Sequence, residues 1–236
     1  MRGAGAGLLL AMVSVAACTS GDNKASAPVA AGAVFTPAPA TRDSSPNAGR
    51  GTVLFLGTSL TAGLGLEPDS AYPQQLQRKI DSAGLAYRTV NAGVSGETSA
   101  GLLRRLEWVL QRPAEVIVVE TGANDGLRGQ PVAGTKATIG KILDRIKQDQ
   151  PGARVLLVQM EAPSNLGGPY TKAFHDMYPE LANAHGVTLL PFLLDRVAGF
   201  PRLNQADGVH PNDEGERIVT ANVWKGLEEV LRAGGR

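Results

Sequence analysis

Apolar runs and amphipathic segments alternate along most of the chain. Short, mostly apolar runs predict buried strands at residues 52–56, 87–91, 116–119, 155–158 and 187–190. Apolar residues at helical spacing predict helices over residues 72–83, 98–110, 131–146, 170–181 and from residue 213 onwards. Because strands that are apolar on both faces are typical of a covered parallel sheet, this pattern predicts an α/β fold with helices on both sides of the sheet.

Polar, glycine-rich segments come directly after several of these strands, at residues 57–60, 91–96, 122–125 and 160–167. In folds with a parallel sheet, ligands bind beyond the carboxyl ends of the strands. We therefore expect these four segments to gather at one edge of the sheet and to form the binding site.

The first fifty residues have a different character. A positive start at Arg2 precedes an apolar run over residues 7–17, which has the length of a signal-peptide core and is too short to span a bilayer. Residues 15–18, Val-Ala-Ala-Cys, resemble the bacterial lipoprotein box. We therefore expect residues 1–17 to be a lipoprotein signal peptide and Cys18 to carry a lipid anchor. The alternative is an ordinary secretory signal that contains a cysteine.

Residues 18–50 are rich in Ala, Pro, Ser and Gly without helical or strand periodicity. This composition predicts a flexible tether between a membrane anchor and a folded domain over residues 51–236, lying in the cell envelope on the periplasmic side if the source has two membranes. The net charge of +1 and the lack of any long Lys or Arg run argue against nucleic acid as a partner. Cys18 is the only cysteine, so no intrachain disulfide can form.

Ser59 is a candidate nucleophile because it lies in the turn after the first predicted strand. A helix that begins just beyond this turn would direct backbone N–H groups at the same space. The alternative for Ser59, taken alone, is a helix N-cap.

A nucleophilic serine needs a base, and the base needs a group that orients it. Asp207 lies three residues before His210, close enough to contact the imidazole Nδ1 and to leave Nε2 facing Ser59. The alternative is a helix-capping loop with a surface histidine. The other two histidines, His175 and His185, occupy positions that we expect to be solvated.

Acyl transfer also requires hydrogen-bond donors for the negative oxygen of the tetrahedral intermediate. Three candidates fall on the predicted sheet-edge segments: the N–H of Ser59, the N–H of Gly96 and the side-chain amide of Asn124. As alternatives, Gly96 can be a simple turn glycine, and residues 124–126 can be a turn without a catalytic role.

Together, the segments around Ser59, Gly96, Asn124 and His210 resemble the four blocks of the SGNH (GDSL-type) hydrolase family, in the same order and across most of the predicted domain. The likeness is closest to the branch that contains bacterial thioesterase I, lysophospholipase L1 and arylesterases. It is carried by residues 91–98, 122–129 and 189–192.

The resemblance implies a three-layer α/β/α, flavodoxin-like fold with a central, mostly parallel five-stranded sheet. It also implies a serine esterase or thioesterase that hydrolyses small acyl esters, acyl thioesters or lysophospholipids through an acyl-enzyme. Ser59 would be the nucleophile, His210 the base and Asp207 its orienting group, while Ser59, Gly96 and Asn124 would donate to the oxyanion. The resemblance implies no metal, no organic cofactor and no particular oligomeric state.

Two positions depart from the family pattern. The usual Gly-Asp-Ser-Leu reads Gly-Thr-Ser-Leu here, with Thr58 in place of the carboxylate, and we expect the retained serine to keep the enzyme active. The usual Pro-x-Asn-Tyr-Gly reads Pro-Ser-Asn-Leu-Gly, which makes Leu166, together with Leu127 and Asn165, a candidate for the acyl pocket.

Two other functions stay open from the sequence. One is deacetylation of an envelope polysaccharide, although an aromatic content of 5% disfavours a sugar site. The other is a non-catalytic surface lipoprotein that keeps the fold and binds a partner, which only the change at Thr58 favours.

Overall fold

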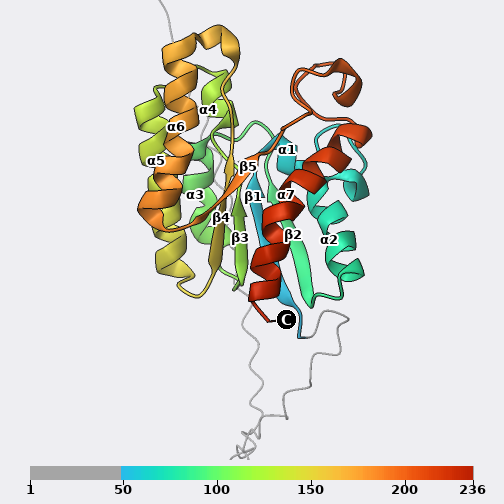
Figure 1. Cartoon of the computed structure of the whole chain (residues 1–236). Helices are drawn as coiled ribbons and strands as arrows, with labels where there is room; N and C mark the ends of the chain where they lie inside the picture. Colours follow the sequence, from blue (N-terminus) through green and yellow to red (C-terminus); the bar gives the residue numbers. More distant parts are fainter. Residues whose placement is uncertain (1–48, 236) are drawn as a thin grey trace, which may run out of the picture. The chain divides into compact units, whose positions relative to one another are not determined.

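Five parallel strands, in the order β2-β1-β3-β4-β5, form the centre of the fold (Figure 1). The computed structural model describes residues 49–235, so the expected signal peptide, Cys18 and nearly all of the expected tether lie outside the described residues. The strands are β1 (Gly51–Gly57), β2 (Tyr87–Gly93), β3 (Val116–Val119), β4 (Arg154–Gln159) and β5 (Thr188–Phe192).

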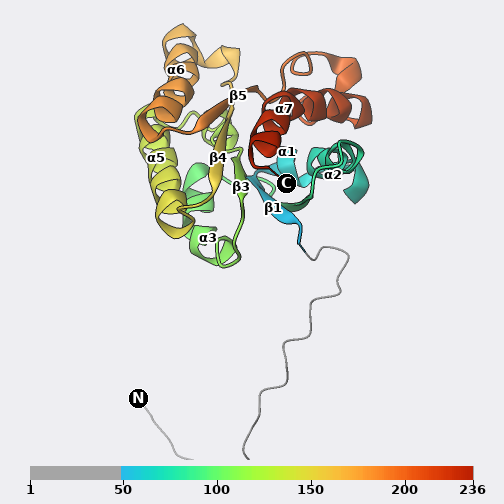
Figure 2. The same cartoon turned by 60° about the horizontal axis from the view of Figure 1, so that its bottom comes forward.

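Helices cover both faces of this sheet and produce three layers (Figures 1 and 2). One face carries α2 (Tyr72–Ser82) and α7 (Asp213–Ala233), and the other carries α3 (Ser99–Val109), α5 (Val132–Asp149) and α6 (Gly168–His185). The predicted α/β/α fold is confirmed. Within residues 49–235, no helix combines the length and the apolar character needed to cross a membrane.

Two short helices, α1 (Ser59–Ala62) and α4 (Ala123–Leu127), follow β1 and β3 at the carboxyl edge of the sheet, within the polar, glycine-rich segments expected there. The 3-10 turns η1 (Pro68–Ser70), η2 (Ser164–Leu166) and η3 (Pro201–Leu203) complete the described elements. The polar segment expected at residues 91–96 begins later than predicted, because its first three residues belong to β2. The strand β2 continues to Gly93 because it stays paired with β1 to the end of that strand, at Gly57.

Polar side chains set where several helices begin. The hydroxyl of Thr98 accepts the N–H of Gly101 and caps α3, as predicted, and the side chain of Asn212 accepts the N–H groups of Glu214 and Gly215 at the start of α7. Pro131 lies just before α5 rather than in its first turn. The Asn212 cap fixes the beginning of α7 only two residues after His210.

The core lies on both faces of the sheet and contains most of the predicted inward positions. The four residues of β3 are fully buried, and so is the predicted inner face of α5, namely Ile139, Ile142, Leu143 and Ile146. The prediction for α7 was incomplete. Ile218 and Val230 are only half-buried, whereas three polar residues of α7 are buried: Glu216, Thr220 and Asn222.

Candidate active site

Ser59 is the first residue of α1, and Thr58 rather than Ser59 occupies the N-cap position. The backbone of Thr58 is extended, and its hydroxyl accepts the N–H of Leu60 at 3.4 Å. The N-cap alternative for Ser59 is therefore wrong. Ser59 is 8% exposed and lines a cavity at the carboxyl edge of the sheet.

Asp207, His210 and Ser59 form one continuous chain of contacts. Asp207 Oδ2 lies 2.7 Å from His210 Nδ1, and His210 Nε2 lies 2.9 Å from Ser59 Oγ. A carboxylate only accepts hydrogen bonds, so the first contact requires a proton on Nδ1 and leaves Nε2 as an acceptor for the serine hydroxyl. The arrangement can therefore draw a proton from Ser59.

The loop that carries Asp207 and His210 is tied to itself and to the end of α1. Asp207 Oδ1 accepts the N–H groups of Val209 at 2.9 Å and of His210 at 3.0 Å. The side-chain amide of Gln205 donates to the carbonyl of Leu64 at 2.7 Å, which links the loop to the segment following α1. Gly208 between the two functional residues has a φ of +70°, so the tight return of the chain favours glycine there.

Asp207 is held as a carboxylate by these contacts. The backbone N–H of His210, followed by that of Val209 and by the His210 side chain, lowers the pKa of Asp207 to about 2. A carboxylate that stays ionised at neutral pH can orient the imidazole and balance the charge that the ring gains with a second proton.

The three expected oxyanion donors surround the same cavity, which Ser59, Gly96 and Asn124 all line. The backbone N–H groups of Ser59 and Gly96 have no backbone or side-chain acceptor within residues 49–235. Asn124 lies in α4 rather than in a turn, and its amide donates one hydrogen bond, at 3.1 Å, to the carbonyl of Glu97. That contact orients the amide and leaves its second N–H available for a ligand.

Neighbouring polar residues that the sequence did not single out hold these donors in place. Asp125 accepts the N–H of Ser99 at 2.8 Å and its hydroxyl at 2.7 Å, which joins α4 to the start of α3. Arg105 pairs with Glu97 at 2.7 Å, and Arg128 donates to the carbonyl of Gly96 at 3.1 Å. Glu97, Asp125 and Arg128 lie within the segments that carry the family resemblance, but the sequence predicted no contact or role for them.

The cavity next to Ser59 has a volume of about 840 Å³. Its wall is largely apolar, with Leu127, Met160, Phe192 and Leu194 among the lining residues. Two of the three expected pocket residues, Leu127 and Asn165, line it. The third, Leu166, is half-buried, is not among the lining residues, and has its side chain beside Gly129.

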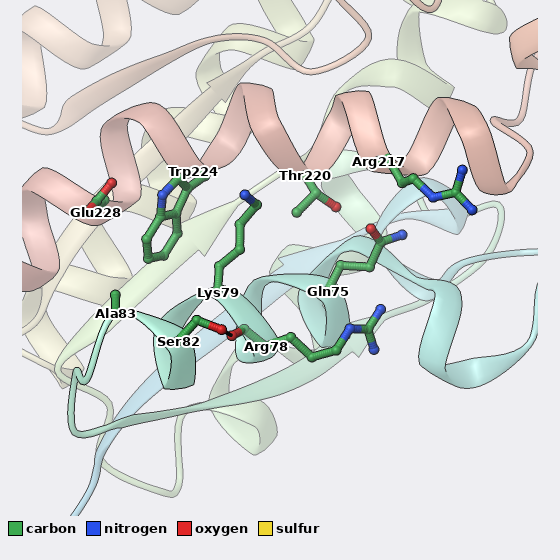
Figure 3. Close-up of a pocket in the computed structure, with 9 residues that line it drawn as sticks. All are labelled: Gln75, Arg78, Lys79, Ser82, Ala83, Arg217, Thr220, Trp224 and Glu228. Carbon is green, nitrogen blue, oxygen red and sulfur yellow. Dashed lines mark hydrogen bonds between the residues drawn. The ribbon is translucent and has the colours of Figure 1, made fainter.

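A second cavity, of about 620 Å³, lies between α2 and α7, and Figure 3 shows the residues that line it. Lys79 lies 5.9 Å from the centre of the Trp224 ring, and Ser82 is the only serine of the lining set. No histidine lines this cavity, so Ser82 has no candidate base there. Of these two cavities, only the one at Ser59 has a histidine in contact with a serine.

The remaining histidines form acid contacts of their own. His175 contacts Glu161 at 2.7 Å, and its side chain is 56% exposed, in agreement with a solvated position. The expectation for His185 was wrong, because its side chain is only 18% exposed and lies 3.0 Å from Asp144, where α6 packs on α5.

Comparison with known proteins gives consistent matches. The family model described as GDSL-like Lipase/Acylhydrolase matches residues 55–218. Esterase TesA of Pseudomonas aeruginosa is 37% identical over 182 residues, which cover 76% of this chain and 89% of that protein. Thioesterase 1/protease 1/lysophospholipase L1 of Escherichia coli (strain K12) is 38% identical over 181 residues, which cover 76% of this chain and 85% of the relative.

A solved structure agrees with the fold. The psychrotrophic esterase EstA from Pseudoalteromonas sp., in a structure inhibited by monoethylphosphonate, superposes with a TM-score of 0.72 at 31% identity. The match covers 77% of this chain and 98% of the esterase. The similarity therefore spans nearly the whole described domain.

Proposed function

The chain belongs to the GDSL-like lipase/acylhydrolase family, and from this premise we propose that it is a serine hydrolase that cleaves acyl esters or thioesters through an acyl-enzyme on Ser59. The observation that carries the proposal is the 2.9 Å separation between His210 Nε2 and Ser59 Oγ, with Asp207 bound to the opposite ring nitrogen. A base in direct contact with a hydroxyl is the arrangement that nucleophilic catalysis requires.

In the first step, Ser59 Oγ attacks the carbonyl carbon of the substrate while its proton passes to His210 Nε2. The carbonyl π electrons move onto oxygen, and the N–H groups of Ser59 and Gly96 and the amide of Asn124 donate to the resulting oxyanion. Asp207 stays ionised and stabilises the imidazolium, because its pKa of about 2 keeps it from taking the second proton at neutral pH.

In the second step, the tetrahedral intermediate collapses, and the bond to the leaving alcohol or thiol breaks as His210 returns the proton to that group. Water then attacks the acyl-Ser59 carbonyl, with His210 again accepting the proton. The bond between the acyl carbon and Ser59 Oγ breaks as His210 returns this proton to Ser59, and the carboxylic acid is released. No other group has to supply or accept a proton in this cycle.

The substrates that we propose carry an apolar acyl chain. The cavity of about 840 Å³ has room for such a chain, and it is lined by apolar side chains from several loops. Three exposed apolar residues, Leu64, Leu127 and Val209, are also among the residues that line the cavity. Esterases, an arylesterase and a lysophospholipase are among the relatives, which supports aryl esters, acyl thioesters and lysophospholipids as the classes to assay.

We further propose that Cys18 anchors the enzyme in the membrane of the cell envelope. This proposal rests on the lipoprotein-like segment at residues 15–18 alone. Mass spectrometry of the native N-terminus tests it: a lipid-modified Cys18 as first residue is the expected result, and an unmodified chain that begins elsewhere contradicts it.

The central experiment measures hydrolysis of short and medium p-nitrophenyl esters, together with labelling by a fluorophosphonate probe. We expect Ser59→Ala and His210→Ala to remove both hydrolysis and labelling. Ser82→Ala is the matched control, because Ser82 lies in the cavity of Figure 3 and should leave both readouts unchanged. Wild-type rates in the Ser59→Ala protein would contradict the proposed mechanism.

A further inference from the structure

Glu120 is a fully buried carboxylate in contact with the turn that carries Ser59. It follows β3 directly, and its side chain is 0% exposed. Its Oε2 accepts the backbone N–H of Thr58 at 2.7 Å and the hydroxyl of Thr61 at 2.9 Å. The hydroxyl of Thr58 lies 3.0 Å from each of the two carboxylate oxygens. The donors that Glu120 accepts therefore come from the residues on both sides of Ser59.

The network extends from Thr61 to α2. The hydroxyl of Thr61 lies 2.8 Å from that of Tyr72, and since Thr61 donates to Glu120, Tyr72 donates to Thr61. Gly57 makes this arrangement possible: a Cβ at that position would lie 1.9 Å from Thr61 Oγ1 and 2.7 Å from Glu120 Oε2. The carboxylate at the end of β3 thus binds α1 directly, and α2 is joined to it through the hydroxyl of Thr61.

Burial of such a group is unfavourable unless its contacts repay the lost hydration. No ion pair to Glu120 occurs within residues 49–235. Burial raises the pKa of Glu120, while the donated hydrogen bonds of Thr58 and Thr61 act in the opposite direction. An apolar residue would fill the same space without the cost of desolvating a carboxylate. We therefore attribute the role of Glu120 to the specific hydrogen bonds that it accepts.

We propose that Glu120 is a positioning residue for the reaction, which fixes the Thr58–Thr61 turn and thereby holds Ser59 Oγ within hydrogen-bond distance of His210 Nε2. The inference rests on the proposed function, because it assigns a role in the activation of Ser59. It also assigns a role to Thr58, the position at which the family motif has an aspartate. In this chain Thr58 is the hydrogen-bond donor, and the carboxylate lies opposite it on Glu120.

This donor–acceptor relation can be reversed by mutation. Glu120→Gln replaces one of the two acceptor oxygens by an NH2 donor, so that a single amide oxygen faces the three donors of the turn, the N–H and hydroxyl of Thr58 and the hydroxyl of Thr61. Thr58→Asp places a second carboxylate beside Glu120, so that one of the two must take up a proton. In the double variant, the amide of residue 120 can donate to the carboxylate of residue 58, which restores a complementary pair.

We expect kcat for a p-nitrophenyl ester to fall about ten- to a hundredfold in each single variant, with KM changed less than threefold, because the nucleophile is misplaced while the cavity is intact. The rate of labelling by a fluorophosphonate should fall in parallel. The double variant should recover at least tenfold over the slower single variant. A double variant no faster than the slower single one, or a Glu120→Gln protein with wild-type kcat, would overturn the inference.

Thr61 provides a test with a smaller change, which serves if Glu120→Gln does not fold. Thr61→Val removes one donor to Glu120 at nearly constant volume and should lower kcat, whereas Thr61→Ser keeps the hydroxyl and should restore it. Equal kcat in these two variants would overturn the role of the network. Thr135→Val is the matched control, because Thr135 is a buried threonine of α5 whose hydroxyl donates to the carbonyl of Pro131, and it should leave kcat unchanged.

The two proposals fail in different ways. If the wild-type protein neither hydrolyses esters nor reacts with the fluorophosphonate, the proposed function itself is wrong. If the wild type is active, Ser59→Ala is inactive and the Glu120 and Thr61 variants keep the wild-type kcat, only the positioning role is wrong.

Discussion

His210 Nε2 lies 2.9 Å from Ser59 Oγ, although 151 positions of the chain separate the two residues. Ser59 begins α1, just beyond the carboxyl end of β1, and His210 lies in the loop just before α7. The amide of Gln205 joins this loop to the segment after α1 through the carbonyl of Leu64. The proton transfer that we propose is therefore direct, and its geometry depends on the orientation of one imidazole.

Asp207→Asn should leave the fold intact and remove most of the activity. The asparagine oxygen can still accept the N–H groups of Val209 and His210, but its amide would donate toward Nδ1. The ring must then carry its proton on Nε2, where it cannot accept the proton of Ser59. We expect kcat to fall by about 10⁴-fold, as in other enzymes with this arrangement, with little change in melting temperature.

A pH–rate profile and circular dichroism complete this test. Asp207→Ala, which leaves Nδ1 without a fixed partner, is the companion variant and should also be strongly impaired. An Asp207→Asn protein that is folded and retains a tenth or more of the wild-type kcat would show that Asp207 does not set the tautomer of His210.

Asn124→Ala should lower kcat by about 10²–10³-fold, because one oxyanion donor contributes roughly 2.7–4 kcal/mol to the barrier. KM should change little, since the donor acts on charge that develops only in the transition state. The amide also donates to the carbonyl of Glu97, so thermal unfolding must be measured alongside. Asn183→Ala, at an exposed asparagine of α6 outside the cavity, is the control, and a similar loss of kcat in both variants would contradict a specific role for Asn124.

The sequence predicts the fold well because the sheet and its covering helices follow apolar periodicity. All five strands occur near their predicted positions, and the capping role of Thr98 follows from a local hydrogen bond. The short helix α4 was missed, because its five residues carry a turn-like Asn-Asp-Gly and too few apolar positions for a period. Its formation depends instead on the tertiary contacts of Asp125 with Ser99.

The candidate site could be predicted only where a recognisable motif was present. Asp207, His210 and Ser59 were expected to meet, and their side chains lie in contact, although their catalytic roles stay a prediction. Glu120 gave no such signal, because a single carboxylate after an apolar strand is ordinarily read as a strand end facing solvent. Its burial becomes visible only when β1, α1 and α2 are assembled around it.

Glu216 should make the stability of the protein depend on pH. Burial raises the pKa of Glu216 to about 8, from an ordinary value of 4.5, against the lowering effect of the Tyr72 backbone N–H, while Asp213 raises it further. Between these two pH values the native state holds a proton that the unfolded chain has released. The contribution of Glu216 to the free energy of unfolding should therefore be fully present below pH 4.5. It should fall by up to about 1.4 kcal/mol per pH unit between pH 4.5 and pH 8.

Urea denaturation of the wild type and of Glu216→Gln at several pH values measures this effect. The amide has no proton to lose, so this variant should lack the contribution, and the difference in unfolding free energy between the two proteins should change across the interval. Parallel pH dependences in the two proteins would show that Glu216 titrates normally.

Gly93 should be intolerant of even one added methyl group. It ends β2, and a Cβ there would lie 2.4 Å from the backbone N of Ala62 and 2.9 Å from the carbonyl oxygen of Thr58. Backbone atoms cannot move aside as a flexible side chain would, so α1 must shift, and Ser59 with it. We expect Gly93→Ala to lower the free energy of unfolding by about 1–3 kcal/mol and to reduce kcat as well.

Gly134 in α5 provides the matched control for this substitution. A Cβ at Gly134 meets no atom within 4 Å, and its φ is not positive, so Gly134→Ala should be neutral or stabilise the helix by up to about 1 kcal/mol. The two variants together separate the general effect of replacing a glycine from the close approach of β2 to α1. If the two variants had the same unfolding free energy and the same kcat, the expectation for Gly93 would be wrong. The turn that holds Ser59 could then shift without loss, although Glu120 binds it on both sides of Ser59.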